Sequence, residues 1–217
     1  MTSEAPVEIV PYDPAWPRLF EEERQALADA IGPWLAGPVE HIGSTAIPGL
    51  AAKPVIDIMA GVATLDASRP ALAAAARLGY CYFPYRPDME HWFCKPSPAF
   101  RTHHLHLIPI GSTQWRRPIA FRNFLRAHAD IAGEYEALKR RLALEHRLDR
   151  EAYTQAKRPF IDRITEMALN MSERRNTGIK TRETGETRES FLGEYPAISR
   201  FSRFSCLSVC NAQLDCG

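Results

Sequence analysis

Five short segments rich in β-branched and aromatic residues constrain the fold of this chain more than any other feature. Each segment is short enough to be a single strand and is bounded by turn-forming residues. Helical segments alternate with the first of these strands, and the later strands cluster in the chain. The sequence therefore predicts an α/β (α+β) fold. The expected strands are residues 39–42, 55–62, 80–83, 91–94 and 104–108.

Two helices are expected around the first strands. Asp13 and Pro14 form a favourable helix start, because aspartate caps a helix and proline costs nothing in the first turn, and this helix should run to about Gly32. Residues 71–78 lack β-branched side chains and are followed by Gly79, which is typical of a helix with its stop signal. Helices and strands thus alternate early in the chain.

Helical periodicity dominates the second half. Apolar residues recur at helical spacing from Phe121 to Leu142, which predicts one long amphipathic helix. Asp149 can cap a further helix, and Pro159 predicts a kink or a break within it.

The composition changes after about Ser172. Residues 173–217 show no sustained periodicity and are rich in Thr, Ser, Arg and Glu. Such a segment cannot bury enough apolar surface to offset the entropy lost on ordering. We therefore expect one domain over residues 1–172 and a disordered tail over residues 173–217.

The overall charge argues against two classes of partner. The chain carries 27 Lys and Arg residues against 26 Asp and Glu, a net charge of +1, so no long-range field attracts a nucleic acid or a membrane. No apolar run approaches the roughly 20 residues of a membrane-spanning helix, and the N-terminus lacks the pattern of a secretion signal. We expect a cytoplasmic protein whose partner is a small molecule. The oligomeric state stays open.

The stretch EHIGSTAIPGLAAKPVIDIM, residues 40–59, combines several groups that bind phosphate. A turn at Gly43 and Ser44 exposes backbone N–H groups, and the serine hydroxyl adds a donor. Lys53 can act as a point charge on the same phosphates, and Asp57 on the next strand can hold a divalent cation bound to them. The alternative is that Gly-Ser-Thr is an ordinary turn and that Asp57 only bonds a neighbouring loop.

The stretch RTHHLHLIPI, residues 101–110, suggests a metal site. On a strand, His104 and His106 project from one face and the residue between them from the other. Two imidazoles and one carboxylate form a recognised open metal site, so we expect Asp57, His104 and His106 to be both metal ligands and catalytic residues. The alternative is one buried structural histidine and one exposed histidine.

The C-terminal helices offer secondary candidates. Tyr153 and Lys157 lie one helical turn apart and can approach the site together to bind substrate, although a core tyrosine and a surface lysine fit the spacing equally well. A basic patch on the preceding helix is expected to be a solvated face; it contains Arg116, Arg117, Arg122 and Arg126.

Several of these motifs together resemble the GrpB family. They are HIGSTAIPGLAAKPVIDIM, the strand with Trp92 and Phe93, RTHHLHLIP, FRNFLRAHADIAGEYEALKRRLA and YTQAKRPFI, in the expected order from about Val7 to Ala168. The resemblance implies the nucleotidyltransferase fold related to polymerase beta, which is a mixed, mostly antiparallel sheet flanked by helices. It also implies a nucleotide-type triphosphate over Gly43 and Ser44, and in some bacteria the domain is fused to dephospho-coenzyme A kinase.

The same resemblance bears on the metal. In the wider superfamily, two acids in an Asp-x-Asp or Asp-x-Glu pattern and a third on a later strand hold two magnesium ions. Here Met59 replaces the second acid, and the strand with His104 and His106 takes the place of the third. One carboxylate with imidazoles suits manganese, zinc or iron better than magnesium.

Two functions follow as expectations. The first is a metal-dependent nucleotidyltransferase-like enzyme that uses magnesium, manganese or zinc and binds a nucleotide or other phosphorylated small molecule. The second is a non-catalytic, regulatory nucleotide- or coenzyme-binding module on a degenerate scaffold, which the missing acid at Met59 favours. Whether the chain is an enzyme stays open.

Overall fold

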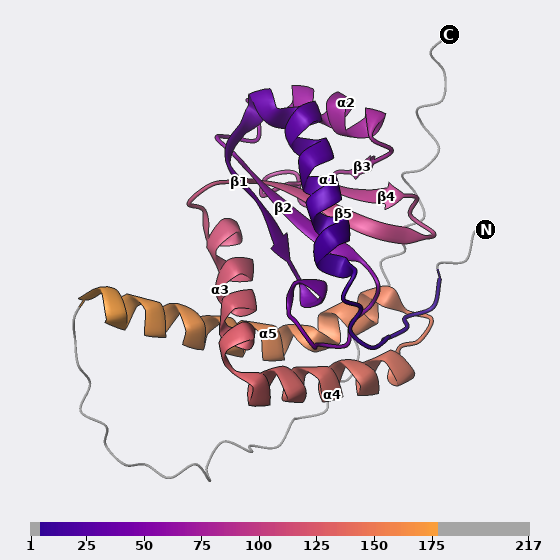
Figure 1. Ribbon diagram of the computed structural model, residues 1–217, viewed down its shortest axis with the longest axis vertical. Helices are drawn as coiled ribbons and strands as arrows, with labels where there is room; N and C mark the ends of the chain where they lie inside the picture. Colours follow the sequence, from indigo (N-terminus) through magenta and orange to yellow (C-terminus); the bar gives the residue numbers. More distant parts are fainter. Residues whose placement is uncertain (1–4, 178–217) are drawn as a thin grey trace. The chain divides into compact units, whose positions relative to one another are not determined.

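A five-stranded sheet forms the centre of the fold in the computed structural model, which describes residues 5–177 (Figure 1). The strand order is β1-β2-β5-β4-β3. Strands β2 and β5 run parallel, whereas the other three neighbouring pairs are antiparallel. The expected mixed, mostly antiparallel sheet is confirmed. The strands are β1 Leu35–Ile42, β2 Ile56–Val62, β3 Cys81–Phe83, β4 His91–Pro96 and β5 Arg101–Pro109.

All five predicted strands are present, but two of them begin earlier than predicted. Strand β1 begins at Leu35, which pairs with Val62 across an irregularity in the ladder that ends at Val39. Gly37 and Pro38 lie inside this irregular part and weaken the strand pattern in the sequence. Strand β5 begins at Arg101 rather than at His104.

Two helices cover one face of the sheet, α1 (Trp16–Ile31) and α2 (Pro70–Arg77). Figure 1 shows α1 in front of the sheet, and the two helices contact each other. Ile56, Ile58 and Leu105 point to this face and are at most 3% exposed, so they form the main core with both helices. Alternating residues of β2 and β5 therefore point to the opposite face, as the period of a strand requires.

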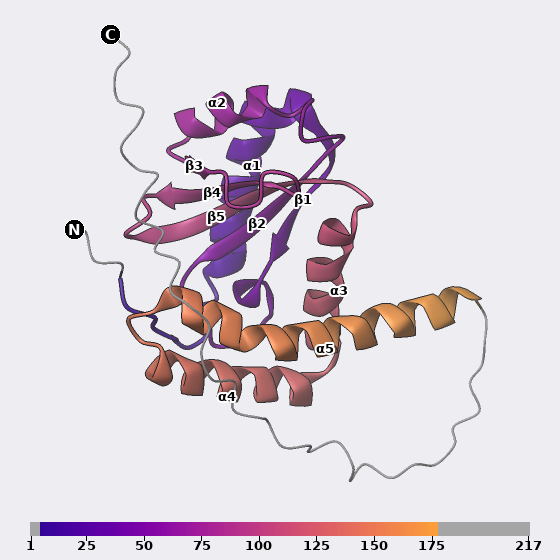
Figure 2. The ribbon, with the colours of Figure 1, turned by 180° about the vertical axis from the view of Figure 1, so that it is seen from behind.

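Three helices follow the sheet in the chain, namely α3 (Thr113–Ala127), α4 (Ala129–Glu145) and α5 (Arg150–Thr177). Helix α3 covers part of the second face, where Trp115 packs against Ile42, Met59 and Ile108. Helices α4 and α5 run side by side in both views (Figures 1 and 2). Both helices contact α3, and their apolar residues form a cluster with α3 and with Ile47 and Leu50 of the loop between β1 and β2.

The single long helix predicted from Phe121 to Leu142 is wrong. The chain forms two helices that separate at His128, whose backbone has non-helical angles of φ −132° and ψ 85°. The His128 ring stacks on Phe124, and its Nδ1 donates to the Phe124 carbonyl at 2.8 Å. Phe124 of α3 and Tyr135 of α4 belong to the same hydrophobic cluster on the two sides of this bend.

Helix α5 is continuous from Arg150 to Thr177, so the chain does not break at Pro159. Pro159 is exposed, so water can bond the backbone carbonyl that loses its partner. The helix continues past Ser172, and residues 178–217 lie outside the described part of the chain, so the disordered tail stays a prediction. Within residues 5–177, no helix has the length and apolar character needed to cross a bilayer.

Candidate functional site

The turn at Gly43 and Ser44 directly follows β1 and is held by Thr45. The Thr45 hydroxyl donates to the Val55 carbonyl at 3.1 Å and lies 3.0 Å from His41 Nε2. Since the hydroxyl proton is already donated, the Thr45 oxygen accepts from the His41 N–H. These two bonds fix both ends of the loop that connects β1 to β2.

Gly43 packs against the carboxylate of Asp57. Its φ of +72° lies in the left-handed region, which favours glycine. A Cβ atom at this position would lie 2.3 Å from Asp57 Oδ2 and 2.9 Å from its Cγ. Glycine is therefore required both by the backbone angle and by the close approach of the carboxylate.

Asp57 is paired with His104 across the parallel strands. The two residues are register partners, and His104 Nδ1 lies 2.8 Å from Asp57 Oδ1. Burial alone would raise the pKa of Asp57, but the hydrogen bond from His104 and the electrostatic influence of His104, His106 and Lys53 hold this pKa at about 2. The carboxylate is therefore ionised at neutral pH.

The His104 ring has one nitrogen bound and one without a partner. Burial lowers the pKa of His104 more than Asp57 raises it, so the neutral ring is favoured and its proton lies on Nδ1. Among the described residues no group bonds His104 Nε2, although this atom is buried. A buried nitrogen of this kind is typical of a position that serves a ligand or a reaction.

His106 makes a second carboxylate pair, which the sequence did not predict. Its Nδ1 lies 2.6 Å from Oε2 of Glu90, whose side chain is 3% exposed. Arg86 forms an ion pair with the other Glu90 oxygen, with 2.7 Å between nitrogen and oxygen. Burial would raise the pKa of Glu90, but His106 and Arg86 together lower it. Glu90 directly precedes β4, and no periodic signal in the sequence connects it with His106.

The arrangement does not fit a metal held by Asp57, His104 and His106. Residues 5–177 contain no group of three or more His, Cys, Asp or Glu side chains that could hold a metal ion. Met59, in the place of a second acid, is fully buried in the cluster with Ile42 and Ile108. The three residues are neighbours on one face, as predicted, but not as a ligand set.

The predicted substrate-binding residues from α5 do approach this face. Lys157 Nζ lies 4.3 Å from the centroid of the Tyr153 ring, and Lys53 Nζ lies 5.1 Å from the same centroid. Burial and the charge of Lys53 lower the pKa of Lys157 to about 7, while Asp57 acts in the opposite direction. Both lysines therefore share one aromatic ring and the electrostatic neighbourhood of Asp57.

Comparison with known proteins settles the family. Residues 6–167 match the family model described as GrpB protein, which is more than half of the chain. The chain belongs to the GrpB family. The resemblance noted from the motifs is thereby confirmed.

Individual GrpB relatives match along most of this chain. A UPF0157 protein of Pseudomonas aeruginosa is 39% identical over 168 residues, which cover 75% of this chain and 68% of that protein. The crystal structure of the conserved protein GrpB from Enterococcus faecalis is 37% identical with a TM-score of 0.70, and the match covers 76% of this chain and 99% of that one. A dephospho-CoA kinase of Mycolicibacterium paratuberculosis is 30% identical over 181 residues, but this match covers 72% of this chain and only 44% of the kinase.

The sequence did not identify two buried residues of α4 in this GrpB protein as parts of the site. Tyr135 is 3% exposed, and burial raises its pKa although a hydrogen bond with Ser44 lowers it in part. Lys139 is 1% exposed and donates to the Ala51 carbonyl, and burial lowers its pKa to about 7. Lys139 lies four residues after Tyr135, so a lysine on the apolar stripe of a helix was the available signal.

The arginines of α3 brace the Gly-Ser loop, so the prediction of a solvated face is wrong for Arg122. Arg122 is 8% exposed and donates to Glu40 at 2.6 Å and to the His41 carbonyl at 2.7 Å. Arg126 donates twice to the Ala46 carbonyl, at 2.9 and 2.6 Å. These hydrogen bonds satisfy the backbone carbonyls of His41 and Ala46, which lie on the two sides of the turn at Gly43 and Ser44.

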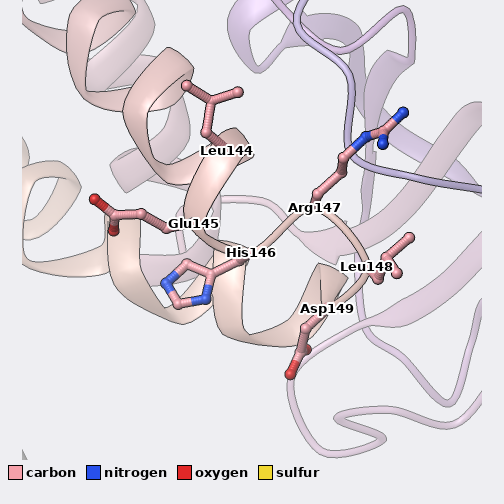
Figure 3. Close-up of a pocket in the computed structure, with 6 residues that line it drawn as sticks. All are labelled: Leu144, Glu145, His146, Arg147, Leu148 and Asp149. Carbon is pink, nitrogen blue, oxygen red and sulfur yellow. The ribbon is translucent and has the colours of Figure 1, made fainter.

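A surface pocket lies apart from these residues, at the turn between α4 and α5. Figure 3 shows six consecutive residues that line it, 144–149, with side chains that point in different directions. None of the candidate residues lines this pocket. This pocket is therefore not part of the candidate site on the sheet face.

The buried lysines predict an unusual dependence of stability on pH. Because Lys139 and Lys157 have pKa values near 7 in the folded protein and 10.5 as the ordinary value, the unfolded chain binds more protons between pH 7 and 10.5. The free energy of unfolding should therefore rise with pH in this window, by up to about 1.4 kcal/mol per pH unit for each lysine. Urea unfolding at pH 7, 8 and 9 measures it. In Lys139→Met, the increase in the free energy of unfolding with pH should be smaller, because one of the two lysines is absent. An increase equal to that of the wild type contradicts the prediction.

Proposed function

We propose that this GrpB protein binds a nucleotide or another phosphorylated small molecule on the sheet face that carries Asp57 and His104. The observation that carries the proposal is the convergence of Lys53 and Lys157 on the single ring of Tyr153. Both lysines act electrostatically on Asp57, which packs against the Gly43 turn. A cation pair therefore lies close to a turn that offers backbone N–H donors.

The charges of the lysines favour an anionic ligand. Lys53 lowers the pKa of Lys157, because two neighbouring ammonium groups disfavour each other. No ion pair to Lys157 is found among residues 5–177. A phosphate placed near both ammonium groups would relieve their repulsion and form charge-assisted hydrogen bonds. Asp57 is itself an anion, so we expect the phosphate on the lysine side of the turn.

Similarity to a dephospho-CoA kinase supports the same class of ligand. That name describes a kinase acting on a phosphorylated coenzyme, and the shared region covers 72% of this chain. Since the match covers only 44% of the kinase, its kinase activity is not transferred to this chain. The comparison favours a nucleotide or coenzyme-type ligand over an unrelated anion.

The second candidate, metal-dependent nucleotidyl transfer, has less support. It requires carboxylates gathered around metal ions, whereas Met59 is buried and Asp57 is engaged by His104. Between a binding module and an enzyme, the paired histidines favour the enzyme.

Lys157→Met is the direct test of the proposed binding. We expect the variant to bind ATP and pyrophosphate at least about tenfold more weakly, because about 1.4 kcal/mol is a modest value for one charge-assisted contact to phosphate. The matched control is Arg158→Met, which removes an exposed cation at the next position of the same helix. Isothermal titration calorimetry of the three proteins gives the affinities. Equal affinities in the two variants, or no binding by the wild type, would refute the proposal.

A further inference from the structure

The two imidazoles on β5 are held in the same way by different carboxylates. His104 Nδ1 lies 2.8 Å from Asp57 Oδ1, and His106 Nδ1 lies 2.6 Å from Glu90 Oε2. An imidazole that donates Nδ1–H to a carboxylate has a fixed ring and tautomer, and its Nε2 then accepts or delivers a proton. The buried His104 Nε2 without a partner among the described residues fits this role.

The spacing of the two histidines suits one phosphoryl group. They lie two residues apart on one face of β5, and two steps of a strand correspond to roughly 6.5 to 7 Å. In phosphoryl transfer the entering and leaving oxygens lie on opposite sides of phosphorus. Two imidazoles at this spacing can therefore serve the two oxygens of one reacting group.

We propose that His104 and His106 form an acid–base pair that hydrolyses a phosphodiester or phosphoanhydride bond of the ligand, with Asp57 and Glu90 as positioning residues. This inference rests on the proposed binding of a phosphorylated molecule. It makes the protein a hydrolase instead of a binding module, and it replaces the shared metal site expected from the sequence.

The proposed step balances with water as the only co-reactant. The water oxygen forms a bond to phosphorus, and its proton passes to His104 Nε2. The bond from phosphorus to the leaving oxygen breaks, and this oxygen takes a proton from His106 Nε2. Exchange with solvent restores both histidines after the products leave. His104 is the base because its buried Nε2 has no hydrogen-bond partner among the described residues and can accept the proton.

The first experiment compares three histidine variants. Wild type, His104→Ala, His106→Ala and His103→Ala are assayed with ATP, a dinucleoside polyphosphate and bis(p-nitrophenyl) phosphate in the presence of EDTA. His103 is the matched control, because it lies on the same strand and points to the other face. We expect wild-type turnover of at least one substrate, at least about a hundredfold loss of kcat in the first two variants, and little change in the third.

Three results would overturn the acid–base pair. They are the absence of turnover by the wild type on all three substrates, activity retained by either His104→Ala or His106→Ala, and wild-type activity abolished by EDTA. The affinity of the same samples for pyrophosphate is also measured, so that a failure of the acid–base pair can be distinguished from a failure of the proposed binding. Binding without turnover refutes the pair alone, whereas the absence of binding refutes both.

Asp57→Asn tests the positioning role. The substitution keeps the shape of the side chain but removes the charge that selects the Nδ1–H tautomer of His104. We expect kcat to fall at least about a hundredfold while the affinity for pyrophosphate stays within about threefold. A kcat equal to that of the wild type would refute the role of Asp57.

Discussion

Gly43→Val is expected to destabilise the protein by about 3 kcal/mol or more, because two separate costs add. A β-branched residue at a φ of +72° costs about 1 to 3 kcal/mol by itself. The new Cβ would also lie 2.3 Å from Asp57 Oδ2, so either the turn or the carboxylate must move. Denaturant unfolding monitored by tryptophan fluorescence measures the loss.

Gly49→Val is the matched control for this effect. Gly49 has a similar φ of +78°, but an added Cβ would meet no atom within 4 Å. The decrease in the free energy of unfolding of Gly49→Val therefore reports the backbone strain alone. The difference between the two variants reports the contact with Asp57. Ser44→Ala, which removes one hydroxyl, should cost about 1 kcal/mol. Equal losses for Gly43→Val and Gly49→Val would show that the turn does not pack on the carboxylate.

Arg122→Met is expected to have the second large effect, a decrease of about 3 kcal/mol in the free energy of unfolding. Arg122 is 8% exposed, and its guanidinium donates to Glu40 and to the His41 carbonyl, so the substitution removes the hydrogen-bond donor of both acceptors. Because these bonds fix the strand that leads into Gly43, the variant should also bind pyrophosphate more weakly. Thermal unfolding and calorimetric titration give the two readouts.

The control for Arg122 lies on the same helix. Arg116 is exposed, so Arg116→Met should change the free energy of unfolding by no more than about 0.5 kcal/mol. A similar loss in both variants would indicate a general effect of charge removal from α3. It would contradict a specific brace on the Gly-Ser loop.

The faces of the strands could be predicted from the sequence because the side-chain period of a strand is strict. Alternation places Asp57 and Met59 on one face of β2 and Ile58 on the other, and the structure confirms this assignment. The same rule places His104 and His106 together. Once β2 and β5 are neighbours, Asp57 and His104 meet without further information.

The remaining features depend on contacts that no local pattern specifies. Glu90 reaches His106 from the segment that leads into β4, so the pair exists only in the folded sheet. His128 interrupts a helical pattern because its ring bonds the backbone and both flanking helices enter one cluster. Lys139 is buried and donates a hydrogen bond to the Ala51 carbonyl, which is far away in the sequence. Tertiary contacts override helical periodicity at these positions.

A crystal structure of the protein with a non-hydrolysable ATP analogue tests the central claim most directly. The account predicts phosphate density within hydrogen-bonding distance of Lys157 Nζ and of the backbone N–H groups at the Gly43–Ser44 turn, on the sheet face that carries His104. Ordered density for the analogue at the turn between α4 and α5, or anywhere else away from Lys53 and Lys157, would contradict it.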